Sequence, residues 1–486
     1  MNRRELLKSG LLAGIGGILT GSAPAYLNSK TSNGKYKNII FYAYDGLTWE
    51  DIGTTRIYKR RHSEEPVHFE RLMKEGVSGS MDSSALTSIV TDSAAATTAW
   101  ATGRKIVSGA LSMYPDDRKL DTILHLAKNK GMATGVISTT RVTHATPAGW
   151  YAQIDWRREE ETIAGQLLDF APDVIIGGGN SRFDPSLRSD GEDYYAKFAD
   201  AGYTVIKDAD RLEANNADKV MGIFSDGHIP YAIDRKFQGV EGPTLKEMTR
   251  AGLEALEGSD QGFVVQIEAG RVDHANHAND PGGALYELLE ADETLGYLLD
   301  FVDQNPDTLL LMASDHGTGS GAVYGVGERY RASSRMFDKI NRHRASFDFM
   351  LDQMDENTSV SEIREIVENG TGYRMKTEQG ELMSKALAGE FVMPDAQSHA
   401  RQPRNTLAHC LIAGTYDEPE TLNMGYVSGQ HLAGPVPAAL YGNHHKSGTL
   451  GMIDNTDLYY FMTEALGIDH KNPEMKAEDA MQYFEH

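Results

Sequence analysis

The segment "FVVQIEAGRVDHANHAND", Phe263 to Asp280, contains the pattern on which the fold of this chain depends. It opens with a short apolar run of the β type, and acidic and histidine residues follow as soon as that run ends. Similar runs recur along the chain between amphipathic helical stretches: "NIIFYAY", "ATGVIST", "DVIIGGG", "YTVIK", "KVMGIF" and "TLLLMAS". Strands that alternate with helices form a mostly parallel sheet with helices on both faces. The sequence therefore predicts an α/β fold with ligand sites at the carboxyl ends of its strands.

Polar and charged residues stand where several of these predicted strands end. Because the carboxyl ends of neighbouring parallel strands lie at one edge of a sheet, we expect such residues to form a single site. The residues in these positions are Asp45 after the first run, His144 and Thr146 after the second, Glu268 and Asp273 in the opening segment, and Asp315 with His316 after "TLLLMAS".

Two pairs of these residues have the spacing of metal ligands. Asp273 and His277 are four residues apart, so on a helix both side chains face one direction, as two ligands of one metal would. Asp315 and His316 are adjacent, which suits a strand-end loop around a metal better than a helix. Taken singly, each is more often a surface or capping residue. A mixed set of carboxylates and imidazoles favours zinc.

A second metal environment is indicated by oxygen ligands alone. The Thr146 hydroxyl and the carboxylates of Glu268 and Asp45 make an all-oxygen set, which favours magnesium. The sequence therefore points to two chemically different metal environments near the same edge of the sheet.

The stretch "VTDSAAATTAWATG", Val90 to Gly103, places Ser93 at the start of a predicted helix. There a serine can simply cap the helix. A helix N-terminus also attracts anions, so the same position suits a hydroxyl that attacks or holds a phosphate. Beside zinc, a serine is a plausible nucleophile because a coordinated cation stabilises the alkoxide. The stretch alone leaves both interpretations open.

Together these motifs resemble the alkaline phosphatase family, whose members use two zinc ions and one magnesium ion. The resemblance is firmest over Asn38 to Gly325 and Val427 to Leu466. It rests on six motifs in a shared order: "YDG", "VTDSAAATTAWATG", "TRVTHATPAGWYA", "EAGRVDHANH", "SDHG" and "GQHLAGPVPAALYG".

The resemblance implies a role for each matching residue. Ser93 would be the nucleophile that is transiently phosphorylated, and Asp92 would help to orient the phosphate-binding group. Arg157 falls where the family has its phosphate-binding arginine, with Arg158 as the alternative. One zinc would be held by Asp273, His277 and His431, the other by Asp45, Asp315, His316 and the Ser93 oxygen, and magnesium by Asp45, Thr146, Glu268 and waters.

Three positions depart from part of the family. Tyr44 replaces the glycine that commonly precedes the bridging aspartate, which keeps the ligand but changes the packing behind it. His144 and His274 resemble the variant of animal enzymes, which has histidines where other members have aspartate and lysine. The resemblance implies that these two histidines lie behind the ligands and tune metal affinity and phosphate release.

Charge and cysteine content limit the classes of partner. The chain carries a net charge of −23, so nucleic acids and anionic membranes are not expected partners. Its single cysteine, Cys410, lies in an apolar context that predicts a buried thiol, and it excludes an intramolecular disulfide. An acidic protein that binds phosphate needs a local source of positive charge such as metal ions.

The N-terminus has the layout of a twin-arginine export signal. Paired Arg3 and Arg4 precede a short, glycine-rich apolar run and an A-x-A site that ends at Ala25. We therefore expect a signal peptide over 1–25, a linker over 26–37 and a single domain over 38–486. Within that domain, residues 317–426 interrupt the strand–helix alternation and predict a helical insertion before His431. The expected location is the periplasm or the medium, without a stable membrane anchor.

The predicted activity is hydrolysis of small phosphate monoesters through a phosphoserine intermediate. The alternatives are a phosphodiesterase or sulfatase of the same fold, or a non-catalytic metal- or phosphate-binding protein. The resemblance also implies a homodimer.

Overall fold

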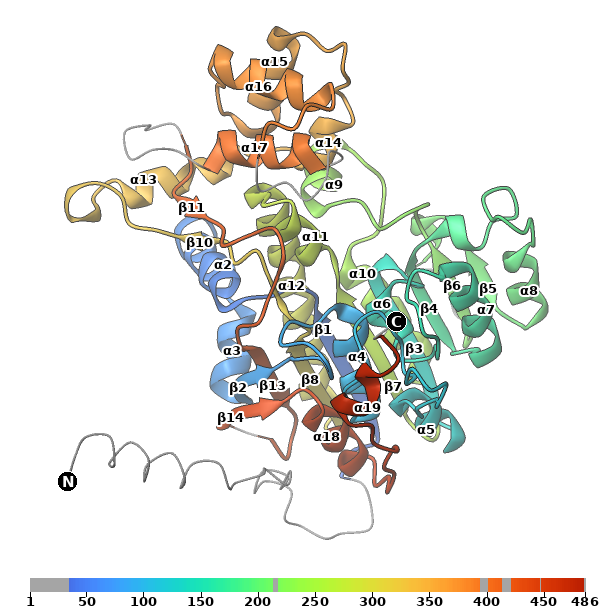
Figure 1. The fold of residues 1–486 in the computed structure, drawn as a ribbon. Coiled ribbons are helices and arrows are strands. Elements are labelled where there is room, and N and C mark those ends of the chain that lie inside the picture. The colour runs from blue at the N-terminus through green and yellow to red at the C-terminus, as the bar shows by residue number, and fades with distance from the viewer. Residues whose placement is uncertain (1–34, 213–216, 394–400, 413–420, 446, 485–486) are drawn as a thin grey trace, which may run out of the picture. The chain divides into compact units, whose positions relative to one another are not determined.

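The computed structural model describes residues 35–212, 217–393, 401–412, 421–445 and 447–484. Its central element is a ten-stranded sheet in the order β14-β2-β13-β8-β1-β7-β3-β4-β6-β5 (Figure 1). All neighbouring strands are parallel except β13, which runs antiparallel to both β2 and β8. The predicted mostly parallel α/β sheet is therefore confirmed.

The seven apolar runs of the sequence form the middle and one side of this sheet. The three strands that the sequence pattern missed, β2, β13 and β14, complete the other side. The strands are β1 (Asn38–Tyr44), β2 (Val77–Asp82), β3 (Ala133–Arg141), β4 (Val174–Gly178), β5 (Thr204–Ile206), β6 (Val220–Ile223), β7 (Phe263–Ala269), β8 (Thr308–Ser314), β13 (Val436–Tyr441) and β14 (Gly448–Asp454).

Helices cover both faces of the sheet, as the side chains of β1 illustrate. Ile40, Tyr42 and Tyr44 share one core cluster with the buried leucines of α10 and α12. Phe41 points to the other face, where its ring lies 4.9 Å from that of Trp100 on α4. The helices are α2 (Trp49–His62), α3 (His68–Glu75), α4 (Ser93–Thr102), α5 (Ile123–Asn129), α6 (Ala145–Ala148), α7 (Glu160–Phe170), α8 (Tyr194–Asp200), α9 (Ala232–Gln238), α10 (Leu245–Leu256), α11 (Arg271–His277), α12 (Pro281–Gln304), α18 (Asp457–Ala465) and α19 (Ala477–Met481), with short 3-10 turns at Asn180–Arg182 and Ala209–Arg211.

The interval 317–426 is largely helical where it is described. It contains β9 (Gly317–Thr318), β10 (Ala322–Val323), η4 (Glu328–Tyr330), α13 (Ser333–Phe337), η5 (Asp338–Arg342), α14 (Phe347–Leu351), α15 (Val360–Thr371), α16 (Thr377–Leu387), α17 (Gln402–Ile412) and β11 (Met424–Gly425). Helices α14 to α17 bury side chains among themselves, including the free thiol of Cys410. After this interval, β12 (His431–Leu432) pairs with β9. That pairing brings His431 back to the end of β8.

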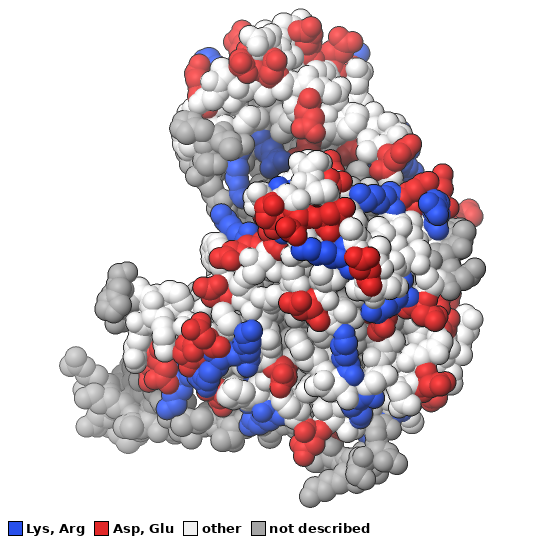
Figure 2. Space-filling view, turned by 90° about the vertical axis from the view of Figure 1, so that its right-hand side faces the viewer, with Lys and Arg blue, Asp and Glu red and all other residues white. Residues whose placement is uncertain are grey.

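The predicted signal peptide and most of the predicted linker lie outside the described residues. In the part of the chain that is described, no helix is long and apolar enough to cross a membrane. Figure 2 shows one face of the molecule, on which acidic and basic side chains are interspersed.

Candidate functional site

Three carboxylates meet at the carboxyl end of the sheet because β1 lies between β7 and β8. Ala43 of β1 is in register with Glu268 on β7 and with Ala313 on β8. Asp45, just after β1, therefore lies beside Glu268 on one side and Asp315 on the other. The rule that sites lie at strand ends is what predicted this convergence.

These carboxylates are buried together with that of Asp273. Asp45, Glu268 and Asp315 are 0% exposed and Asp273 is 4% exposed. Within the described ranges, no lysine or arginine forms an ion pair with any of them, and only histidines do. Burying several negative charges without matching positive charge is very costly. The cluster therefore has the chemistry of a cation site.

Burial is the largest influence on the protonation of this cluster. It raises the pKa of Asp45 well above its usual range, and the charges of Asp315, Asp273 and Glu268 raise it further. Burial likewise raises the pKa of Glu268 to about 7, against the hydrogen bonds that it accepts. One oxygen of each of these two side chains has no hydrogen-bond partner: Asp45 Oδ1 and Glu268 Oε1. Free, buried carboxylate oxygens fit metal ligands.

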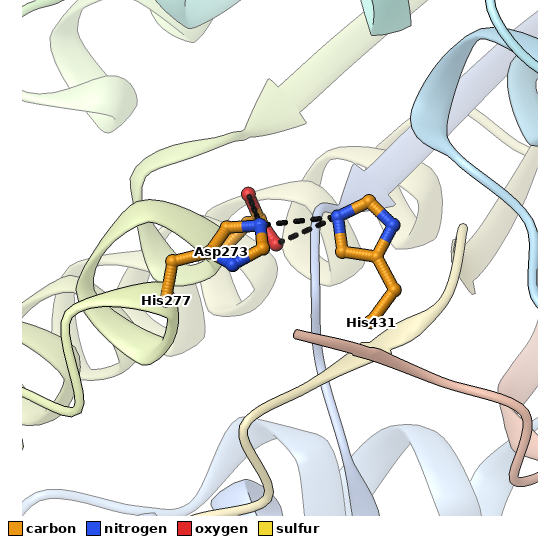
Figure 3. A group of neighbouring side chains, drawn as sticks. All are labelled: Asp273, His277 and His431. Carbon is orange, nitrogen blue, oxygen red and sulfur yellow. Dashed lines mark hydrogen bonds and ion pairs between the residues drawn. The ribbon is translucent and has the colours of Figure 1, made fainter. Parts of the chain in front are cut away.

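The first candidate metal group consists of Asp273 and His277 on α11 and His431 on β12, whose side chains point toward one another (Figure 3). The Nε2 atoms of His277 and His431 lie 3.1 Å apart, and His277 Nε2 lies 3.4 Å from Asp273 Oδ2. Each imidazole donates from Nδ1 to a backbone carbonyl: His277 to Gly429, at 2.8 Å, and His431 to Thr91, at 2.9 Å. Their Nε2 atoms therefore both present lone pairs, and these residues fit zinc.

The second group surrounds His316. Asp45, Asp273 and His316 offer ligand atoms close enough to hold one ion. The Nε2 atom of His316 lies 3.0 Å from Asp315 Oδ2 and 3.3 Å from the hydroxyl of Ser93. The structure thus brings together the four residues that were expected at the second zinc.

The third group contains Asp45 and Glu268, as expected for magnesium, but also His144. The Thr146 hydroxyl lies 3.3 Å from Asp45 Oδ2, so it too is within reach. Glu268 is held by the hydroxyls of Ser138 and of Thr140, the latter at 3.1 Å. His144, which was expected behind the ligands, therefore lies close enough to be one.

Ser93 is the first residue of α4, and it is not the cap. The N-cap is Asp92, whose side chain accepts a hydrogen bond from the Ala95 N–H at 3.1 Å. The capping interpretation of Ser93 is therefore wrong, because the preceding carboxylate already fills that role. The Ser93 side chain is left free to face His316, and the residue is 2% exposed.

Arg157 is tied to Asp92 by a closed ring of contacts. Its Nη1 donates to Asp92 Oδ2 at 2.9 Å, and its backbone N–H donates to the Gly109 carbonyl at 2.7 Å. The Gly109 N–H donates in turn to the Asp92 carboxylate, at 3.1 Å from Oδ2. Arg158, by contrast, is exposed and lies over the Trp156 ring. This geometry supports Arg157, not Arg158, as the arginine beside Ser93.

Three further residues around the site, Thr318, Gly109 and His228, were not predicted from the sequence. Thr318 donates to Asp273 Oδ1 at 2.6 Å and lies 3.2 Å from His316 Nδ1, so it joins two candidate zinc groups. Gly109 completes the cycle of hydrogen bonds between Asp92 and Arg157. The imidazole of His228 packs against the imidazole of His274. Thr318 directly follows "SDHG" and could have been found from that motif. Gly109 and His228 carry no local signal.

The chain is similar to several known proteins. A family model described as "Alkaline phosphatase" matches residues 36–468. A Thermus thermophilus alkaline phosphatase of known structure is 40% identical, with a TM-score of 0.90, covering 95% of this chain and 98% of that chain. Alkaline phosphatase 3 of Bacillus subtilis is 27% identical over 95% of this chain and 97% of its own length. The repressible alkaline phosphatase of Saccharomyces cerevisiae is 33% identical over 61% of this chain, which spans 57% of that relative.

Proposed function

Because the chain belongs to the alkaline phosphatase family, we propose that it hydrolyses phosphate monoesters through a covalent phosphoserine at Ser93. The observation that carries this proposal is the position of the Ser93 hydroxyl, 3.3 Å from His316 Nε2 and beside the buried carboxylates. A hydroxyl at a helix N-terminus next to a cation site is placed to attack an anionic phosphorus centre.

The chain's own residues divide the reaction into two displacements. The Ser93 Oγ loses its proton to solvent and forms a bond to phosphorus while the bond from phosphorus to the ester oxygen breaks, and the departing alkoxide takes a proton from solvent to leave as the alcohol. Water then attacks the phosphoserine, which restores the Ser93 hydroxyl and releases inorganic phosphate. Through both steps, Arg157 holds two non-bridging oxygens with its planar guanidinium, and Asp92 holds Arg157 in place.

The residues around Ser93 fit two zinc ions and one magnesium ion. Asp273, His277 and His431 would hold one zinc; Asp45, Asp315, His316 and the Ser93 oxygen would hold the other. Asp45, Thr146 and Glu268 would hold magnesium, with His144 close enough to contribute. When bound, these ions supply positive charge that acidifies the Ser93 hydroxyl and stabilises the departing oxygen.

A phosphodiesterase or sulfatase of the same fold is the alternative enzyme class. Arg157 favours a monoester, because the terminal phosphoryl group of a monoester presents more negative charge to the Arg157 guanidinium than a diester does. A non-catalytic phosphate-binding protein is disfavoured, since binding alone requires no hydroxyl at the position of Ser93.

We also propose that the chain is exported by the twin-arginine pathway and acts in the periplasm or the medium as a homodimer. In this proposal, residues 1–25 are the signal, 26–37 a linker and 38–486 one domain with an insertion over 317–426. Its partners would be small phosphorylated substrates, without a stable membrane anchor.

The direct test is hydrolysis of p-nitrophenyl phosphate by the purified protein, with and without a chelator. We expect activity that chelation abolishes and that zinc with magnesium restores. Bis-p-nitrophenyl phosphate serves as the diester control. Activity that survives complete metal removal, or a preference for the diester, would contradict the proposal.

A further inference from the structure

Three histidine side chains pack together beside the phosphate-binding arginine. The ring centroids of His144 and His274 lie 5.6 Å apart, those of His228 and His274 4.3 Å apart, and those of His144 and His228 5.5 Å apart. All three histidines are partly exposed, so solvent reaches this cluster. Three guanidinium groups contact it, from Arg141, Arg157 and Arg271.

Two of these guanidinium groups are balanced by a carboxylate. Arg141 makes a two-pronged pair with Glu160, at 2.7 Å in both contacts. Arg157 pairs with Asp92 at 2.9 Å. Their positive charges are therefore matched within the protein.

The third guanidinium, that of Arg271, has no such partner. Arg271 is 9% exposed, its Nε has no hydrogen-bond partner, and among the described residues no carboxylate forms an ion pair with it. It stacks on the Tyr231 ring, with the guanidinium carbon 3.7 Å from the centroid, and its Nη1 lies 3.1 Å from His274 Nδ1. A buried cation without a counter-ion is costly, which makes this group suited to an anion.

Two buried acidic side chains that interact electrostatically with Arg271 make their hydrogen bonds to other groups. These are Asp234 and Glu287. Asp234 accepts hydrogen bonds from the backbone N–H of Ser346, at 2.7 Å, and from its hydroxyl, at 2.6 Å. Glu287 accepts from the Ala232 N–H at 2.7 Å. Both carboxylates are thus held by other donors, and neither forms an ion pair with Arg271.

We propose that Arg271 and His274 form a subsite for a second phosphate group on the substrate, with the His228 ring, which Arg141 contacts at both nitrogens, packed against His274. The proposal rests on the proposed function, because the scissile phosphate is taken to sit at Arg157. The subsite adjoins that position: Arg157 Nη2 lies 3.2 Å from His144 Nε2, and the His144 ring packs on that of His274. Since Arg271 can only donate, His274 accepts at Nδ1 and carries its hydrogen on Nε2, where it can donate to a phosphate oxygen. The preferred substrates are thus phosphomonoesters whose alcohol carries another phosphate a few bonds away.

The test compares two probes, butane-1,4-diol bisphosphate and butane-1,4-diol monophosphate, on the metal-loaded enzyme. The bisphosphate has two equivalent ends, so chance alone favours it about twofold. We expect kcat/KM for the bisphosphate to be about tenfold higher or more, the size of a charge-assisted hydrogen bond. Arg271→Gln should reduce this ratio to about the twofold chance value. We compare the ratio of kcat/KM for the bisphosphate to kcat/KM for the monophosphate. Both probes undergo the same hydrolysis step, so an effect of the substitution on that step cancels in the ratio.

Arg158→Gln is the matched control, since it removes an exposed arginine near the same site and should leave the ratio unchanged. If Arg271→Gln does not fold, as judged by its Tm, Arg271→Lys replaces it and should lower the ratio by removing the planar fork. A wild-type ratio near two, an unchanged ratio in the Arg271 variant, or an equal fall in both variants would overturn the subsite.

Calorimetry separates this proposal from the proposed function. The metal-loaded Ser93→Ala protein is titrated with each probe, so no hydrolysis is needed. We expect the bisphosphate to bind about tenfold more tightly, and Arg271→Gln in that background to remove the difference. An enzyme without phosphatase activity would contradict the proposed function and leave this affinity ratio to decide on the subsite. Equal affinities, or no binding of either probe, would overturn it.

Discussion

The imidazoles of His277 and His431 point their Nε2 atoms at each other across 3.1 Å. Behind each ring a backbone carbonyl takes the Nδ1 hydrogen, so neither Nε2 can donate to the other. The carboxylate of Asp273 faces the same point. Lone pairs that converge in this way are stabilised by a shared cation, and for this reason we propose the first zinc here.

Replacing one of these ligands should therefore remove a metal ion. We expect His431→Ala to contain about one zinc fewer per chain than the wild type, since it leaves only two of the three protein ligands of this site. Elemental analysis of the purified protein checks this. His444→Ala is the control, because His444 is an exposed histidine with no place in the candidate site. Unchanged zinc content in His431→Ala would rule out this ligand set.

The arginine beside Ser93 should act on monoesters selectively. Arg157→Ala removes charge-assisted hydrogen bonds worth about 1.5–3 kcal/mol, so kcat/KM for monoesters should fall by about tenfold to a hundredfold or slightly more. Diester hydrolysis should fall much less, because a diester offers the fork less charge. Arg158→Ala is the matched control. An equal fall in kcat/KM for monoesters and diesters in Arg157→Ala, or a selective fall only in Arg158→Ala, would show that Arg157 does not bind the phosphate.

The ring through Gly109 should position Arg157. Gly109 has a φ of +89°, and a Cβ there would lie 2.5 Å from the Trp156 ring. Gly109→Ala should lower the free energy of unfolding by about 1–3 kcal/mol through overpacking, in addition to the backbone strain. It should also raise KM for monoesters, because it displaces Arg157.

Gly202→Ala is the control for backbone strain alone. Gly202 has a φ of +90°, close to that of Gly109, but a Cβ there would meet no other atom. Gly202→Ala should lower the free energy of unfolding by about 1–2 kcal/mol and leave KM for monoesters unchanged. Thermal unfolding and steady-state kinetics measure both effects. If the two variants behave alike, the hydrogen bonds through Gly109 have no part in positioning Arg157.

Export should depend on the paired arginines at the N-terminus. Replacing Arg3 and Arg4 with lysine should leave the precursor in the cytoplasm, because twin-arginine transport recognises that pair. Cell fractionation with immunoblotting distinguishes the precursor from the mature form. Normal amounts of mature protein in the periplasm would contradict the signal interpretation.

Most of the strands that the sequence predicted are buried along their length, whereas the three strands on one side of the sheet, β2, β13 and β14, were not predicted. "FVVQIE" and "TLLLMAS" are continuous apolar runs because helices cover both faces of β7 and β8. The edge strand β14 reads "GTLGMID" and its neighbour β2 reads "VSGSMD", and both leave several residues partly or fully exposed. Strand β13 contains Pro437, which lowers strand propensity. Their pairing is decided by contacts that a local pattern does not contain.

The same division holds for the candidate site. The spacing of Asp273 and His277 is local, so the shared helix face could be predicted, and the residues at strand ends followed from topology. Arg157 lies 65 residues from its partner Asp92, so only the resemblance indicated it. Unpaired Arg271 had no signal at all, because the absence of a carboxylate around a side chain is a property of the folded chain.

Trapping the phosphorylated enzyme shows whether Ser93 is the nucleophile. The metal-loaded protein is mixed with a monoester carrying labelled phosphate, quenched in acid within milliseconds, and digested for mass spectrometry. We predict one labelled peptide with phosphate on Ser93, and Ser93→Ala should lose both the label and most of the activity. Label on another residue, or unchanged labelling in Ser93→Ala, would contradict the account.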